Sequence, residues 1–216
     1  GLHWDDSVIY QSTQIARFFE LLEDLTAQQV IYHCDCTRQR LNLLNGIYDS
    51  KCHKLNHSKD NTSVRLSIKD SLKLIGSKND NINFCDRIMG NYFQSLTQEV
   101  GDFVLRRRDG LISYQLAVVI DDHLQGITEI IRGADLIDST PRQILLQQCL
   151  GYKTPIYGHI PLAMNNLGQK LSNGCRFPLG SSGVPPPDSM RAVKPLCSSP
   201  NASHGINCTS SSTCLI

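Results

Sequence analysis

Four residues in the N-terminal part of the chain have types and spacing suited to binding a metal ion. Cys34, Cys36 and Cys52 fall within nineteen residues, with Tyr48 between them, in the pattern C-x-C-x11-Y-x3-C. Three thiolates can converge on one tetrahedral ion if the intervening chain folds back, and Zn²⁺ accepts sulfur ligands without adding redox chemistry. The pattern therefore predicts a zinc site.

Spacing does not choose the fourth ligand of this site. Tyr48, His53 and His57 are all close enough in sequence. Histidine is the usual ligand, because a phenol with a pKa of about 10 must lose its proton to bind a metal well. The alternative interpretation is three reduced cysteines that only pack as small apolar side chains.

The hydrophobic pattern indicates the elements that hold the cluster. Apolar residues at helical spacing predict a helix over residues 12–30, and Thr37 suits the N-cap of a second helix that ends near Gly46. Alternating apolar and polar residues predict a strand over 64–68. A further strand is expected over 103–105, before a turn at Asp109-Gly110.

The second half of the chain is typical of an α/β protein. A nearly continuous apolar run predicts a strand buried on both faces over 114–120, with Asp121-Asp122 as its polar end. Another strand is expected over 127–131. A helix should start at Ser139-Thr140-Pro141 and stop at Gly151. His159 is interpreted as an ordinary hydrogen-bonded histidine near a strand end.

Composition excludes several classes of function. The 216 residues carry a net charge of +1, so a whole-chain electrostatic grip on nucleic acid is not indicated. Residues 106–108 are three arginines, which we interpret as a solvated edge. No apolar run approaches the 18–20 residues, roughly, that a membrane span requires. Without a signal peptide, we expect a cytoplasmic protein, in which clustered cysteines indicate metal or catalysis.

The last 43 residues, 174–216, differ from the rest. They contain six of the nine prolines, four of the nine cysteines and nine serines, with only four charged residues. Such a segment buries too little apolar surface to offset the entropy of ordering it, so we expect residues 174–216 to form a disordered tail.

A series of short motifs then agrees, in register, with a known family. The bacterial glutamyl-Q tRNA(Asp) synthetases are similar to about residues 1–172 of this chain, including the cysteine–tyrosine cluster. The other matching motifs are Gly1-Leu2-His3-Trp4-Asp5, Gly101-Asp102-Phe103-Val104-Leu105-Arg106-Arg107, Tyr114-Gln115-Leu116-Ala117-Val118-Val119, Ile131-Arg132-Gly133-Ala134-Asp135 and Ser139-Thr140-Pro141-Arg142-Gln143.

The resemblance implies a class I synthetase chemistry. Glutamate and ATP, with Mg²⁺, form glutamyl-adenylate, and the glutamyl group passes to queuosine in the anticodon of tRNA(Asp). Tyr114 and Arg132 would bind the glutamate, and Tyr48 would be the fourth zinc ligand beside Cys34, Cys36 and Cys52. An arginine fork is the natural partner of a carboxylate. The protein is expected to be a monomer with one zinc ion.

The chain departs from the family at two places. The His-Ile-Gly-His-like ATP motif is absent, because the sequence starts downstream of it. Lys170, Leu171 and Ser172 match the start of the Lys-Met-Ser-Lys-Ser-like ATP loop, but Asn173 replaces its second lysine, which normally offsets phosphate charge. We interpret this as a truncated, impaired form with a frameshift near residue 173.

The resulting expectation is a partial Rossmann-like class I catalytic domain. Its parts would be the helical end of the first Rossmann half (1–28), a zinc-bearing insertion (29–110), the second Rossmann half (111–173) and the tail (174–216). One alternative is a fragment of ordinary glutamyl-tRNA synthetase. Another is a non-catalytic, zinc-stabilised module that binds tRNA or glutamate without activating it.

Overall fold

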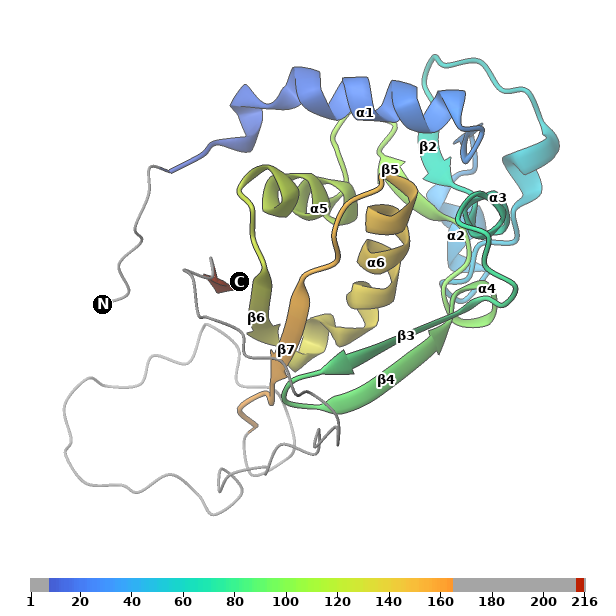
Figure 1. Ribbon diagram of the computed structural model, residues 1–216. Helices are drawn as coiled ribbons and strands as arrows, with labels where there is room; N and C mark the ends of the chain where they lie inside the picture. The colour runs from blue at the N-terminus through green and yellow to red at the C-terminus, as the bar shows by residue number, and fades with distance from the viewer. Residues whose placement is uncertain (1–7, 165–212, 216) are drawn as a thin grey trace, which may run out of the picture.

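The computed structural model describes residues 8–164 and 213–215 (Figure 1). Its α-helices are α1 (Ile15–Ala27), α2 (Arg38–Asn42), α3 (Ile68–Leu74), α4 (Leu96–Glu99), α5 (Tyr114–Leu124) and α6 (Thr140–Cys149). The 3-10 helices are η1 (Gln11–Thr13), η2 (Lys51–Lys54) and η3 (Ala134–Ser139). The strands are β1 (Ile31–Cys34), β2 (Ser63–Leu66), β3 (Asn81–Asp86), β4 (Gly90–Ser95), β5 (Phe103–Arg106), β6 (Glu129–Gly133), β7 (Ile156–Ile160) and β8 (Thr213–Leu215).

These strands form three separate sheets. Strands β1, β2 and β5 form an antiparallel sheet, and β3 and β4 form an antiparallel hairpin. Strand β6 lies between β7 and β8 and is parallel to both. Figure 1 shows the β3–β4 hairpin passing below α6 toward β6 and β7. The fold is therefore α/β, as the sequence predicts, with its parallel sheet in the C-terminal part.

The β6–α6–β7 unit forms where the sequence places its signals. Pro141 lies in the first turn of α6, where its missing N–H would have no helical partner. Gly151 follows the helix with a φ of 68°, a conformation that favours glycine. The predicted helix is confirmed, and β6 overlaps the strand predicted over 127–131. Strand β7, which no sequence pattern predicted, pairs parallel with β6, so the carboxyl ends of the two strands lie side by side.

The strand predicted over 114–120 is wrong, because this segment begins α5. The Ser113 hydroxyl accepts a hydrogen bond from the Leu116 backbone N–H at the start of the helix. The helix continues through Asp121 and Asp122, so they do not form a polar strand end. Periodicity alone does not separate a short buried strand from a buried helix, and here the polar residues that lengthen the helix were assigned to a turn.

The predictions for the N-terminal half are largely confirmed. Helix α1 falls inside the predicted 12–30 segment, and β2 and β5 match the strands predicted over 64–68 and 103–105. Thr37 caps α2, since its hydroxyl accepts a hydrogen bond from the Arg40 backbone N–H at 3.2 Å. No sequence pattern predicted α3 or the β3–β4 hairpin.

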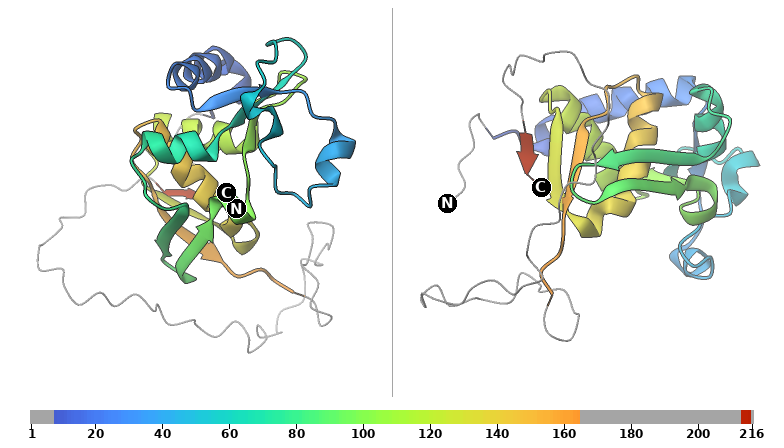
Figure 2. Two further views of the ribbon diagram at one scale, coloured as in Figure 1. Left: turned by 90° about the vertical axis from the view of Figure 1, so that its right-hand side faces the viewer. Right: turned by 60° about the horizontal axis from the view of Figure 1, so that its bottom comes forward.

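A single main core joins the two halves. Leu22 of α1, Leu66 of β2 and Leu145 of α6 all belong to it and are buried. A small second cluster of buried residues consists of Cys34, Tyr48 and Cys52. Figure 2 shows α2 and the chain around it projecting from the main body. The division of the chain at residues 28 and 110 stays a prediction.

Part of the segment predicted to be a disordered tail forms a strand. Residues 213–215, inside the 174–216 segment, form β8 and pair with β6 from Glu129 to Ile131. Extended chain therefore covers part of the β6 edge. The remainder of the predicted tail lies outside the described residues. Within the described ranges, no helix is both long and apolar enough to span a membrane.

Candidate functional site

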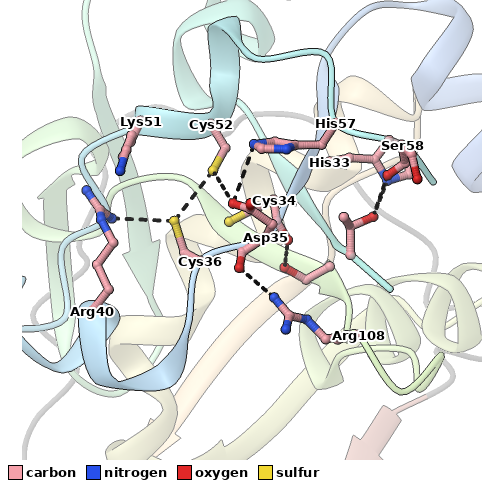
Figure 3. Close-up of polar contacts among 12 residues, drawn as sticks. His33, Cys34, Asp35, Cys36, Arg40, Lys51, Cys52, His57, Ser58 and Arg108 are labelled. Carbon is pink, nitrogen blue, oxygen red and sulfur yellow. Dashed lines mark hydrogen bonds and ion pairs between the residues drawn. The ribbon is translucent and has the colours of Figure 1, made fainter. Parts of the chain in front are cut away.

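Three short elements bring the predicted metal ligands together. Cys34 ends β1, Cys36 follows two residues later, and Cys52 lies in η2 (Figure 3). Tyr48 pairs as an isolated bridge with Gly101. A Cβ atom on Gly101 would lie 2.5 Å from the Tyr48 backbone nitrogen, so only glycine allows this approach.

The donor atoms of the cluster face one another at short range. The Tyr48 Oη lies 3.3 Å from Cys34 Sγ and 3.4 Å from Cys36 Sγ, and Cys36 Sγ lies 3.4 Å from Cys52 Sγ. The three sulfurs all lie within 4.8 Å of one another. A tetrahedral zinc site with Zn–S bonds of about 2.3 Å has edges of about 3.8 Å. The donor set therefore fits zinc after small movements.

Burial and hydrogen bonding shift the pKa values of the cysteine and tyrosine side chains in different directions. Burial raises the pKa of Cys52 to about 11. Burial, together with hydrogen bonds to the cysteine sulfurs, also raises the pKa of Tyr48. For Cys34, burial acts in the same direction, but hydrogen bonds from Tyr48 and Arg65 outweigh it and lower the pKa to about 7. A divalent cation would reverse the penalty on Cys52 and Tyr48.

Two arginines line the cluster. The guanidinium carbon of Arg65 lies 3.9 Å from the centroid of the Tyr48 ring, and Arg65 is 5% exposed. Arg40 donates to Cys36 Sγ at 3.5 Å. Three thiolates and a phenolate around Zn²⁺ would have a net charge of −2, which these two cations would offset. They also favour an anionic oxygen at Tyr48.

Of the two histidines considered as fourth ligands, His53 bonds to a carboxylate outside the cluster and His57 lies beside Cys52. His53 Nε2 bonds to Asp70 Oδ2 at 2.5 Å, away from the sulfurs. His57 Nε2 lies 3.4 Å from Asp35 Oδ1 and forms a second group with Asp35 and Cys52. Tyr48, by contrast, contacts both Cys34 and Cys36. The geometry therefore favours the tyrosine over either histidine as the fourth donor.

A second constellation surrounds Arg132, near the carboxyl end of β6. Its side chain is buried, with the residue 2% exposed. Arg132 Nε donates to His159 Nε2 at 3.1 Å, and Nη2 donates to Thr140 Oγ1 at 2.7 Å. Among the described residues, Nη1 makes no hydrogen bond. Nη2 also donates to the backbone carbonyl of Leu136 at 3.5 Å.

Tyr114, the other predicted glutamate residue, begins α5 and is 43% exposed. The described residues supply no hydrogen bond between it and Arg132. Tyr114 lies on α5 and Arg132 on β6. Their joint role in glutamate binding stays a prediction. Lys170, Leu171, Ser172 and Asn173, the predicted ATP loop, lie outside the described residues.

His159 and Asp86, which no sequence pattern assigned to the site, lie next to Arg132. His159 is fully buried on β7, in register with Arg132, and its Nδ1 lies 2.6 Å from Asp86 Oδ2. Asp86 ends β3 and is 1% exposed. No local motif marks either residue, because they meet only after the β3–β4 hairpin packs against the parallel sheet.

Asp121 and Asp122, the acidic pair on α5, have different surroundings. Asp121 accepts a hydrogen bond from Gln11 at 2.7 Å. Asp122 is 8% exposed, and burial raises its pKa to about 6, although the positive charge of Arg132 opposes the rise. Asp122 therefore belongs to the electrostatic surroundings of Arg132.

The sequence profile of tRNA synthetases class I (E and Q), catalytic domain, matches residues 1–174. The chain is 44% identical over 202 residues to a glutamyl-Q tRNA(Asp) synthetase of Pseudomonas fluorescens, covering 94% of the chain and 65% of the relative. It is 44% identical over 194 residues to the glutamyl-Q tRNA(Asp) synthetase of Pectobacterium atrosepticum, covering 90% of the chain and 58% of the relative. The chain thus spans less than two thirds of these relatives.

Solved structures agree with the fold. A glutamate tRNA ligase from Elizabethkingia meningosepticum superposes with a TM-score of 0.62 at 22% identity, covering 79% of this chain and 37% of that one. The glutamate-tRNA synthetase of Elizabethkingia anophelis gives a TM-score of 0.61, also at 22% identity, covering 75% and 36%. At this identity the likeness concerns the fold alone.

Proposed function

Because the chain belongs to the catalytic-domain family of class I tRNA synthetases (E and Q), we propose that it binds glutamate and takes part in its ATP-dependent attachment to tRNA. The acceptor we propose is queuosine in tRNA(Asp). The observation that carries this choice is the identity of 40–44% with relatives named glutamyl-Q tRNA(Asp) synthetase over about nine tenths of the chain.

The glutamate site is proposed at Arg132 and Tyr114. Arg132 lies near the carboxyl end of a parallel strand, where open α/β sheets bind their ligands. Its Nη1 group has two N–H donors for a carboxylate, in a site dry enough to strengthen the ion pair. The exposed Tyr114 hydroxyl would fix the orientation of the amino acid.

Adenylate formation is proposed to use ATP with Mg²⁺ and residues 170–173. Lys170 provides a positive charge for the phosphates, but Asn173 contributes none. Electrostatic stabilisation of developing phosphate charge is a large catalytic term. We therefore propose that Asn173 slows this step, and that the Asn173→Lys variant accelerates glutamate-dependent pyrophosphate exchange.

Zinc is proposed at Cys34, Cys36, Tyr48 and Cys52. When bound, it would tie β1 to η2 and so hold the small cluster of buried residues that the main core does not include. Arg65 and Arg40 would offset the negative charge of the ligands. We assign this ion a structural role, because four protein donors leave no open position for a substrate.

A transfer assay tests the proposed acceptor. Radiolabelled glutamate is supplied with ATP and Mg²⁺, and with tRNA(Asp) carrying queuosine, tRNA(Asp) carrying guanosine, or tRNA(Glu). We expect label only on the first. Label on tRNA(Glu) would instead support an ordinary glutamyl-tRNA synthetase, and glutamate binding without label on any tRNA would support a non-catalytic module. Arg132→Gln should abolish transfer, whereas Arg17→Gln, on the exposed part of α1, should not.

Metal analysis tests the zinc ligands. We expect one zinc per chain in the purified protein, little in Cys52→Ser, and an unchanged content in Cys149→Ser. Cys149 is the matched control, because it is a buried free cysteine on α6, outside the cluster. Equal zinc in Cys52→Ser and in the unmodified chain would refute the assignment.

A further inference from the structure

Three elements from different parts of the chain meet in one buried row of polar groups. Asp86 ends β3, His159 lies on β7, and Arg132 lies on β6. The row runs from Asp86 Oδ2 to His159 Nδ1 (2.6 Å), and from His159 Nε2 to Arg132 Nε (3.1 Å). All three residues are at most 2% exposed.

The carboxylate of Asp86 is fixed by the backbone. Its Oδ1 accepts hydrogen bonds from the N–H groups of Ile88 (3.0 Å), Met89 (2.8 Å) and His159 (3.0 Å). Its Oδ2 is left for the imidazole ring. The carboxylate therefore cannot rotate without losing several hydrogen bonds in a dry environment.

The donor and acceptor roles along the row follow from the chemistry of arginine. A guanidinium group can only donate, so His159 Nε2 must accept from Arg132 Nε. The proton of the neutral ring is then on Nδ1, where it is donated to Asp86. Each group thus has one compatible role, and the ring is held in a single tautomer.

We propose that His159 and Asp86 are positioning residues for Arg132: Asp86 fixes the tautomer of His159, and His159 holds the guanidinium in the orientation that presents Nη1 to the substrate carboxylate. The substrate part of this proposal rests on the proposed glutamate site. Thr140 holds the other edge of the guanidinium through Nη2. These contacts use Nε and Nη2, and the proposal assigns Nη1 to the ligand.

Substitutions with matched shapes test the proposal. Asp86→Asn keeps the shape of the side chain but replaces one carboxylate oxygen by an NH2 group. This NH2 group must face either the three backbone N–H groups or the N–H of the His159 ring, and in both cases a donor meets a donor. His159→Gln keeps one donor and one acceptor, whereas His159→Leu keeps neither. His123→Leu is the control, because His123 lies exposed on α5 and stacks on Tyr152.

The first measurement is glutamate affinity by calorimetry. We expect the dissociation constant to rise about tenfold or more in His159→Leu and Asp86→Asn, with most of the affinity restored in His159→Gln and no change in His123→Leu. Unchanged affinity in His159→Leu, or an equal loss in His159→Gln and His159→Leu, would overturn the proposal.

The second measurement does not depend on glutamate. ¹⁵N-detected NMR should show His159 protonated on Nδ1 alone, and an Arg132 Nε–H that exchanges slowly in the unmodified chain and rapidly in His159→Leu. A proton on Nε2, or an equally protected Arg132 Nε–H in His159→Leu, would refute the positioning role. If this pattern is present but glutamate does not bind the unmodified chain, the proposed function fails and the positioning of Arg132 stands.

Discussion

At the cysteine cluster, three sulfurs and a phenol from one short stretch of chain face one another, whereas at Arg132 a carboxylate, an imidazole and a guanidinium from three separate strands form hydrogen bonds. Burial raises the pKa of Cys52 and Tyr48, whereas hydrogen bonds lower the pKa of Cys34 to about 7. Around Arg132, hydrogen bonds run without interruption from Asp86 to Thr140. The first region has the donor set of a metal site, whereas in the second the residues of the chain bind one another.

The difference also concerns packing. Arg132 lies beside the main core, to which β6 contributes Ile130 and β7 contributes Tyr157. The cysteine cluster is separate from that core and is made from short elements. A region with few buried apolar side chains has little stability of its own. Zinc would therefore have a large local effect at the cluster and a small one at Arg132.

Loss of a metal ligand should have the largest effect. In Cys52→Ser we expect the free energy of unfolding of the zinc-bound region to fall by about 5 kcal/mol, a part of the 10–16 kcal/mol, roughly, that structural zinc contributes. Limited proteolysis should then cleave between residues 34 and 63. Cys149→Ser should resist cleavage like the unmodified chain. Equal resistance in Cys52→Ser would mean that the cluster does not depend on metal.

Removal of Asp86 should have the next largest effect. Asp86→Ala leaves the buried backbone N–H and ring of His159, and the partly buried N–H groups of Ile88 and Met89, without this acceptor. We expect the free energy of unfolding, measured in urea, to fall by about 4 kcal/mol, since each unsatisfied buried group costs about 1–3 kcal/mol. A loss below about 1 kcal/mol would show that the Arg132 region is not held by this network.

Replacing Asp122, unlike the two preceding substitutions, should raise the free energy of unfolding. Its pKa is raised to about 6 from an unfolded value near 3.9, so the folded chain binds more protons between these values. Stability from this group should therefore fall as the pH rises from about 4 to 6, by at most about 3 kcal/mol, and stay level above. Asp122→Asn should remove that fall and stabilise the chain at pH 7. The exposed Asp60→Asn variant is the control, and an unchanged pH profile in Asp122→Asn would contradict the assignment.

The two regions also differ in how much of each could be predicted from the sequence. The cysteine–tyrosine pattern lies within nineteen residues, so its spacing alone indicated a common site. Asp86 and His159 are 73 residues apart, and no local pattern joins them. Their contact depends on how the β3–β4 hairpin packs, which periodicity does not predict.

Local signals predicted most elements correctly, with one instructive failure. The Thr37 cap and Pro141 in the first turn of α6 are specific chemical signals, and both helices form where expected. The apolar run over 114–120 is compatible with a strand or a helix. The Ser113 cap, which decides in favour of the helix, was not recognised.

Replacing Arg65 should give the smallest effect and sharpen the account of the cluster. Arg65→Met removes the cation over the Tyr48 ring while keeping an apolar stem. We expect zinc affinity in a competition titration to fall about tenfold, because the phenolate loses about 1.4 kcal/mol of stabilisation. In a Tyr48→Phe background the same change should cost clearly less, because only the effect of Arg65 on Cys34 is then lost. Equal losses in both backgrounds would show that Arg65 does not act through Tyr48.

Hydrogen–deuterium exchange before and after chelation of zinc tests the contrast between the two regions most directly. We predict that chelation removes protection from β1, the 35–50 segment and η2, and leaves β6, α6 and β7 protected as before. A uniform loss of protection, or no loss at the cysteine cluster, would contradict the account.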